Sequence, residues 1–146
     1  MQITSPSGAR EAGCIYFDFN FPASVTDAWA YPQLSFNGSD APPAGADGVR
    51  YTLQTPPNAN LKSQNVIWFD KDDAQFSAHT RANASDGSPQ QMTVLFKDAL
   101  WDHQGPPPSD PTIGAGRVGK MAVGLNLAKS GAAAQMAVCG LEWIRF

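Results

Sequence analysis

The stretch AVCGLEWIRF, residues 137–146, decides the fold together with CIYFDFNF, residues 14–21. Both are rich in aromatic and β-branched residues, which favour strands, and they carry Cys139 and Cys14. We expect these two strands to lie side by side, with the cysteines joined by a disulfide. In the chain-entropy model a bridge that closes so long a loop stabilises the fold by about 4–5 kcal/mol, and it implies an oxidising compartment. The alternative is two buried thiols in a cytosolic protein.

The rest of the chain also indicates strands. Apolar and polar residues alternate with a period of two, the pattern of a half-buried strand, within residues 28–36, 49–54, 65–70, 74–81, 90–97 and 117–127. Gly, Pro and Asn turns separate these segments, and no segment has a convincing helical period. About eight short strands of this kind predict an all-β fold, a two-sheet antiparallel β-sandwich or jelly roll, formed by residues 1–146 as a single domain.

Composition excludes several kinds of partner. The chain has 146 residues, of which 42% are hydrophobic and 16% charged, and its formal net charge is -3. It has no basic cluster for nucleic acid and no apolar run near the roughly 20 residues of a membrane span. The first residues lack the basic and apolar regions of a signal peptide. We therefore interpret Met1 as the start of a module, expected to be monomeric, that was cut from a secreted parent.

The outward faces of the predicted strands offer the groups that bind sugars. Sugar rings present C–H groups on their faces and hydroxyls on their rims, so a binder needs aromatic platforms and planar hydrogen-bonding side chains. The candidate platforms are Tyr31, Trp68 and Trp101. The candidate hydroxyl partners are Arg50, Gln54, His79, Arg81 and Gln91. Trp101 is the strongest candidate platform because it opens a long Pro-rich loop, whereas Trp143 is expected mainly in the core.

Four stretches carry a family resemblance: GVRYTL (48–53), QMTVLFKDALW (91–101), VGKMAVGL (118–125) and GLEWIRF (140–146). Together they resemble the β-jelly-roll carbohydrate-binding modules of secreted glycoside hydrolases, a galactose-binding-domain-like sandwich, and most of all the family 11 type. The resemblance implies non-catalytic binding of a β-glucan or related plant cell-wall glycan. It also implies a secreted parent chain with a catalytic domain that the module targets to its substrate.

The resemblance further implies a structural calcium ion between the terminal strands. Modules of this kind carry a calcium ligand at an Asp position of the last strand, where this chain has Glu142. A glutamate carboxylate can bind calcium. An exposed or ion-paired Glu142 is the alternative.

Two other classes of function stay open at this stage. A small sandwich enzyme, such as a lyase or cyclase, would use Asp102 and His103 in the long loop, although two histidines are too few for a His-rich zinc centre. A protein-interaction or adhesion module would instead present an exposed aromatic patch to a protein.

Overall fold

The computed structural model describes residues 13–20, 28–54, 61–80, 89–127 and 133–146. This part of the chain consists of strands and two short 3₁₀ segments. The strands are β1 (Cys14–Asn20), β2 (Ala28–Ala30), β3 (Gln33–Ser35), β4 (Gly48–Gln54), β5 (Leu61–Asp70), β6 (Gln75–Thr80), β7 (Gln90–Leu95), β8 (Leu100–Trp101), β9 (Val118–Leu127) and β10 (Ala133–Ile144); the 3₁₀ segments are η1 (Gly38–Asp40) and η2 (Phe96–Asp98). Over the described residues, no helix is both long and apolar enough to cross a bilayer.

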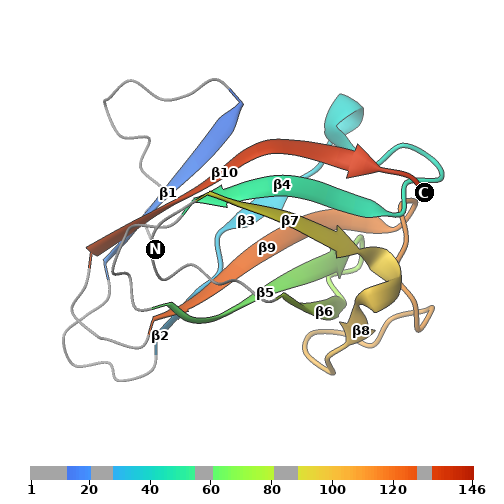
Figure 1. Ribbon diagram of the computed structural model, residues 1–146. Helices are drawn as coiled ribbons and strands as arrows, with labels where there is room; N and C mark the ends of the chain where they lie inside the picture. The colour runs from blue at the N-terminus through green and yellow to red at the C-terminus, as the bar shows by residue number, and fades with distance from the viewer. Residues whose placement is uncertain (1–12, 21–27, 55–60, 81–88, 128–132) are drawn as a thin grey trace.

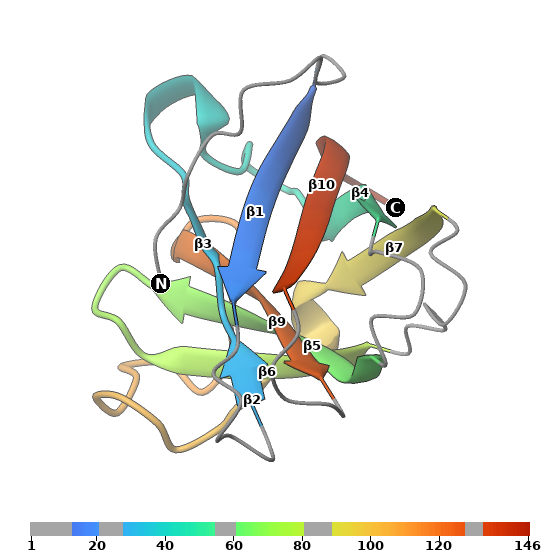
Figure 2. The ribbon, with the colours of Figure 1, turned by 90° about the vertical axis from the view of Figure 1, so that its left-hand side faces the viewer.

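The strands form two sheets that pack face to face (Figures 1 and 2). The four-stranded sheet has the order β1-β10-β4-β7. The six-stranded sheet has the order β2-β9-β5-β6-β8, with β3 also paired to β9. All of these pairs are antiparallel. The predicted two-sheet antiparallel sandwich is therefore confirmed.

The first and last strands are neighbours, as the sequence predicts (Figure 2). In the register of β1 and β10, Cys14 lies opposite Cys139, and the two are joined by a disulfide. Gly140 has a left-handed φ of 59° and coincides with a register shift between Cys139 and Glu142. Glycine adopts this conformation at little cost, so β10 bulges there and still pairs with β4 beyond the bulge, where Glu142 lies opposite Arg50.

Large apolar side chains fill the space between the sheets. Trp68, Tyr51 and Phe76 are almost completely buried. The ring of Trp68 meets that of Phe96 edge-on, with centroids 4.9 Å apart. Trp143 packs against this cluster, as expected for a mainly core residue, and its Nε1 donates to the backbone oxygen of Asp40 over 3.1 Å.

Residues 28–36, expected as one strand, form β2 and β3 with a break at Tyr31 and Pro32. Proline has no N–H group and so cannot donate to a β-ladder. Pro32 is instead buried, and its carbonyl oxygen accepts from the Val123 N–H over 3.1 Å. The break places Tyr31 in the link between two strands that both pair with β9.

Candidate functional site

The outer face of the six-stranded sheet carries an apolar strip bordered by polar groups. The outward positions of β5 lie beside outward positions of β9 on one side and of β6 on the other. We call this surface the Tyr31 face; its residues are Tyr31, Asn65, Ile67, Phe69, Ser77, Asp102, Lys120, Ala122 and Gly124.

Tyr31 lies over the strip and is held there by close packing. Its half-buried ring packs on three apolar side chains, those of Ile67, Phe69 and Ala122. Gly124 makes room for the ring, because a Cβ atom added at Gly124 would lie 2.5 Å from Cε1 of Tyr31. The same added atom would lie 2.1 Å from Oδ1 of Asn65. Because Gly124 has no side chain, the Tyr31 ring and the Asn65 amide can both lie close to its position in β9.

The environment of Tyr31 favours the neutral form of its phenol. Burial raises the pKa of Tyr31 above the usual tyrosine value, a hydrogen bond with Asn65 acts in the opposite direction, and the negative charge of Asp102 adds to the rise. A neutral phenol can donate and accept hydrogen bonds. Tyr31 therefore combines an aromatic surface with a hydroxyl of the kind that sugar recognition requires.

Asp102 is fixed at the border of the face by three contacts. Its Oδ2 accepts from Oγ of Ser77 over 2.5 Å, and its Oδ1 accepts from the N–H of Gln104 over 2.9 Å. The Asp102 N–H itself donates to the backbone oxygen of Gln75 over 3.1 Å. A carboxylate has about four lone-pair positions, so Asp102 keeps acceptor capacity for a further hydroxyl group.

Lys120 borders the strip at its other end. Its Nζ lies 5.0 Å from the centre of the Phe69 ring and 2.6 Å from Oδ1 of Asp73. The ammonium group is therefore held between an aromatic ring and a carboxylate, and its stem covers part of the apolar strip.

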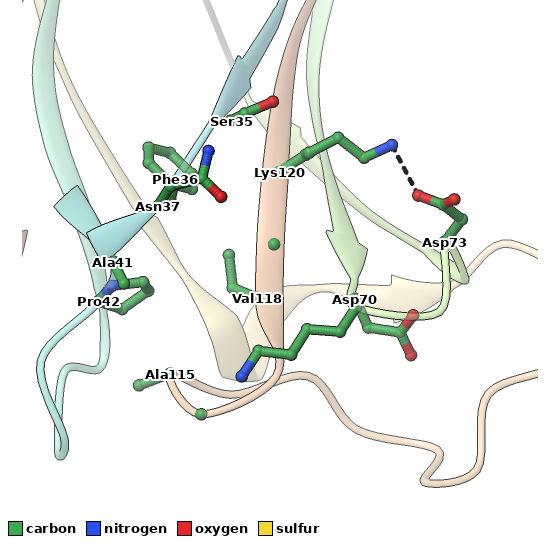
Figure 3. Close-up of a pocket in the computed structure, with 13 residues that line it drawn as sticks. Ser35, Phe36, Asn37, Ala41, Pro42, Asp70, Asp73, Ala115, Val118 and Lys120 are labelled. Atoms are coloured by element: carbon green, nitrogen blue, oxygen red, sulfur yellow. Dashed lines mark ion pairs between the residues drawn. The ribbon is translucent and has the colours of Figure 1, made fainter. Parts of the chain in front are cut away.

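A pocket of about 520 Å³ adjoins this end of the Tyr31 face (Figure 3). We call it the end pocket; its lining comes from residues 35–42, 70–73 and 115–120. Figure 3 shows Phe36 and Pro42 on one side of it and Lys120 and Asp73 on the other. Its volume is in the usual range for small-molecule sites, about 300–1,000 Å³.

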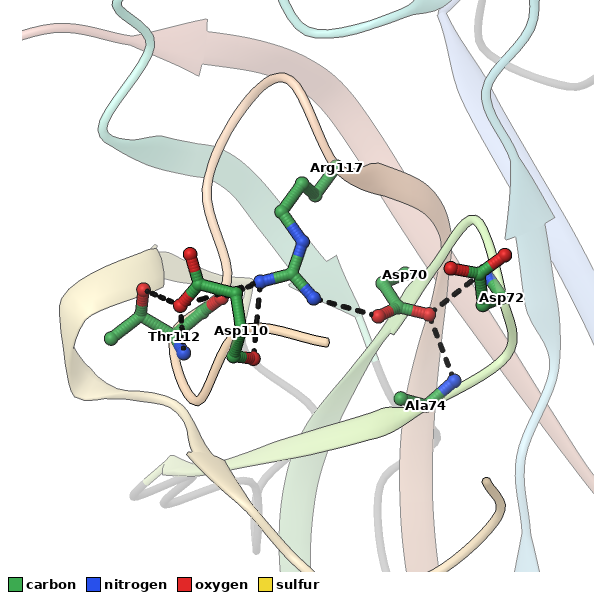
Figure 4. Close-up of polar contacts among 6 residues, drawn as sticks. All are labelled: Asp70, Asp72, Ala74, Asp110, Thr112 and Arg117. Carbon is green, nitrogen blue, oxygen red and sulfur yellow. Dashed lines mark hydrogen bonds and ion pairs between the residues drawn. The ribbon is translucent and has the colours of Figure 1, made fainter. Parts of the chain in front are cut away.

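The loop between β8 and β9 is tied to the sheet by Arg117 (Figure 4). Nη2 of Arg117 donates to Oδ2 of Asp70 over 2.9 Å, and Nη1 donates to the backbone oxygens of Asp110, over 3.1 Å, and Thr112. Asp70 is 2% exposed, and its Oδ1 accepts from the N–H groups of Asp72 and Ala74. We call these contacts the Arg117 latch.

Asp110 completes the latch from the loop side. It accepts from both the N–H and the hydroxyl of Thr112. These bonds, together with the positive charge of Arg117, lower the pKa of Asp110. The latch therefore fixes the loop whose first residue is Asp102.

Trp68 is a core residue, so its predicted role as a sugar platform is wrong. Its relative exposure is 0%, whereas Ile67 and Phe69 point to the outer face. The side chains on both sides of this strand are apolar. When the two sides of a strand do not differ in polarity, the sequence does not show which side faces the core. The structure places Tyr31 outside and Trp68 inside.

Trp101 lies at the edge of the sheet. It pairs with Phe76 in the β6–β8 register, and its half-buried ring packs against the core. The His103 ring contacts it at a tilt of 42°, with centroids 4.0 Å apart. The residue as a whole is half-buried, and its role as a platform stays a prediction. The neighbours Asp102 and His103 engage different partners, which gives the hypothesis of an enzyme built on this pair no geometric support.

Three of the predicted hydroxyl partners gather on the opposite side of the sandwich. Arg50, Gln54 and Gln91 all lie on the outer face of the four-stranded sheet, where Thr52 pairs with Gln91. We call this surface the Arg50 face; its residues are Arg50, Thr52, Gln54, Gln91, Thr93 and Glu142. These side chains and Tyr31 therefore cannot contact the same sugar ring.

The other two predicted hydroxyl partners are His79, which lies in β6, and Arg81, which follows β6 in the sequence. The backbone of His79 lies opposite Asn65, which places His79 in register with the Tyr31 face. Arg81 lies outside the described residues. Both assignments stay predictions.

Glu142 forms an ion pair with Arg50, and the calcium ion that the resemblance implies at this position stays a prediction. Oε1 of Glu142 lies 3.3 Å from Nη1 of Arg50, and the two side chains are 58% and 40% exposed. A guanidinium beside the carboxylate repels a second cation. Within the described ranges there is no group of three His, Cys, Asp or Glu side chains that could hold a metal ion.

Several residues of the Tyr31 face were missed by sequence reasoning. Asn65 and Ser77 are neutral polar residues in predicted strands, and Lys120 is one of several isolated lysines. Phe69 carried a signal, because its alternation with Trp68 marked it as facing the other side of the strand. The pairing of β5 with β9 was needed to tell which of the two sides is the outer one.

The two antiparallel sheets that pack face to face define the fold class, a β-sandwich. A solved structure of this class is similar to the chain: a family 11 carbohydrate-binding module from Clostridium thermocellum in complex with a β-1,3-1,4-mixed-linked tetrasaccharide. The two share 9% sequence identity over 93% of this chain and 91% of the other, with a TM-score of 0.52. This likeness confirms the expected fold. The chain matches no protein-family model and no curated protein sequence.

Proposed function

We propose that this protein is a non-catalytic module that binds a β-glucan or a related plant cell-wall glycan along the Tyr31 face. In this proposal it holds a catalytic domain of the same secreted parent chain near its polysaccharide. The module binds as a monomer.

One observation carries the proposal: an aromatic ring is fixed over an apolar strip and surrounded by ordered polar groups. Tyr31 packs on Ile67, Phe69 and Ala122 and keeps part of its surface open to solvent. Asp102 is already oriented by its bonds to Ser77 and Gln104. A preformed site loses little conformational entropy on binding, so this arrangement suits a sugar ring with an apolar face and hydroxyls at its rim.

The fold adds support from a different direction. The similar family 11 module was solved with a mixed-linked glucan tetrasaccharide, and the likeness covers most of both chains. Proteins that share a fold need not bind the same ligand. The proposal therefore depends on the Tyr31 face, and the shared fold is additional support.

The same surface favours binding over catalysis. The Asp102 carboxylate accepts from Ser77 and from the start of the loop, and the His103 ring packs against Trp101. In a catalytic dyad these two side chains would contact each other. The disulfide between Cys14 and Cys139 supports a secreted parent, because such bonds persist in oxidising compartments.

The proposal is tested by affinity electrophoresis in gels that contain barley β-glucan, xyloglucan, xylan or mannan. We expect retardation in at least one glycan and a loss of affinity of at least about tenfold in Tyr31→Ala, the size expected for an anchoring aromatic. Tyr16→Ala is the matched control, because Tyr16 is also half-buried but lies in β1 of the other sheet.

Two results would contradict the proposal. A folded wild-type protein that migrates freely in every gel would favour a protein partner or an enzyme. Equal losses in Tyr31→Ala and Tyr16→Ala would move the binding site away from the Tyr31 face.

A further inference from the structure

The end pocket is continuous with the Tyr31 face. Ser35 and Lys120, which line the pocket, form a register pair two residues along from the pair of Gln33 with Ala122. Strands rise about 3.3 Å per residue, so Lys120 lies about 13 Å along β9 from Gly124, where the Tyr31 ring sits. A chain of sugars that covers Tyr31 and continues in this direction would reach the pocket.

One wall of the pocket is apolar and preformed. Phe36 is half-buried, and its ring meets Trp143 edge-on with centroids 4.8 Å apart. Pro42 extends this wall, and the buried Val118 also lines the pocket (Figure 3). The C–H face of a sugar ring can pack against such a surface.

The polar groups of the pocket are suited to hydroxyls. Asn37 stands at the N-cap position of η1, yet its side chain makes no capping hydrogen bond, so its exposed amide can bind a ligand. On the opposite side Lys120 and Asp73 form their ion pair. Together these groups present donors and an acceptor to hydroxyls at the rim of a ring.

We propose that the end pocket takes the terminal sugar of a glycan whose inner sugars lie on the Tyr31 face, so that the protein recognises a chain end. This inference rests on the proposed function. A terminal ring carries a free hydroxyl where an inner ring continues into its neighbour. A recess lined by residues 35–42, 70–73 and 115–120 can contact such a ring on more than one side. The ion pair of Lys120 and Asp73 can both donate to and accept from the additional hydroxyl.

Two glycines provide a matched test. Gly116 lines the end pocket, and a Cβ atom added there would meet nothing within 4 Å. Gly114 is equally open but lines a different pocket, beside Ile113 and Phe146. Neither glycine has a left-handed φ. Gly116→Trp should therefore fill the end pocket without backbone strain, and Gly114→Trp is its control.

The experiment is isothermal titration with linear mixed-linkage glucan chains of increasing length, on the wild type, the two tryptophan variants and Tyr31→Ala. We expect the number of protein molecules bound per chain to stay constant as the chains lengthen. We also expect Gly116→Trp to weaken binding at least about tenfold, while Gly114→Trp stays within about twofold of the wild type.

The outcomes separate this inference from the proposed function. If the number bound per chain rises with length, or Gly116→Trp binds like the wild type while Tyr31→Ala does not, the chain-end inference is wrong and the binding module stands. If the wild type binds no glucan of any length, the chain-end inference falls together with the glucan assignment of the proposed function.

Discussion

The two outer faces of this sandwich are both polar at their borders, yet they differ in what lies at their centres. On the Arg50 face the charged groups pair with each other, as Arg50 does with Glu142, and the other outward residues are Thr and Gln. On the Tyr31 face an aromatic ring covers an apolar strip, and polar groups surround it. The comparison shows that the Tyr31 face offers a partly exposed aromatic ring beside its hydrogen-bonding side chains, whereas the Arg50 face offers hydrogen-bonding side chains alone.

The largest expected effect concerns the Arg117 latch, which borders the Tyr31 face and has no counterpart among the described residues of the Arg50 face. Arg117→Met removes the charge partner of the buried Asp70. Leaving such a carboxylate unpaired costs about 3 kcal/mol, and we expect the loop with Asp102 to loosen, which would weaken glycan binding. Urea unfolding and affinity electrophoresis measure the two effects. Gln54→Ala on the Arg50 face should keep its free energy of unfolding within about 0.5 kcal/mol of the wild type. Equal losses of stability and binding in the two variants would contradict the expected difference between the two faces.

A smaller effect is expected from moving Tyr31 without changing its chemistry. Gly124→Ala adds a methyl group where Tyr31 and Asn65 already meet, and overpacking of this kind costs about 1–3 kcal/mol. Because the ring must shift, glycan retardation should fall as well. Gly48→Ala is the control, because its added methyl group would meet backbone atoms of Val94 and Leu95 in the other sheet. It should lower the free energy of unfolding and leave glycan retardation unchanged while the protein is folded. Normal retardation by Gly124→Ala would show that the position of Tyr31 is not critical.

The smallest effect is expected at Glu142. Exposed ion pairs are worth about 0.2–1 kcal/mol, so Glu142→Gln should lower the free energy of unfolding by no more than that, equally in calcium and in chelator. Denaturant titrations in both conditions measure the difference. A loss that appears in calcium alone would instead identify Glu142 as a calcium ligand and revise the assignment of Arg50 as its partner.

The fold could be predicted further than the site. The strand-forming composition of residues 14–21 and 137–146, with one cysteine in each, was enough to predict that these strands are neighbours and that a disulfide joins them. Trp68 was misplaced because β5 is apolar on both of its sides, and the side that Tyr31 covers is apparent from the pairing with β9. Asp102 and Ser77 are 25 positions apart and meet because β6 pairs with β8. Such contacts depend on tertiary register, which local patterns do not encode.

The bridge between Cys14 and Cys139 has a mechanical consequence. A protein that is pulled through its two ends normally carries the load along its whole backbone. Here a tensile force passes directly from β1 to β10 through one covalent bond, and the 125-position segment between the cysteines bears none of it. The Tyr31 face lies wholly within that segment and is therefore shielded from stretching, so a ligand bound there would not be released by tension between the chain ends.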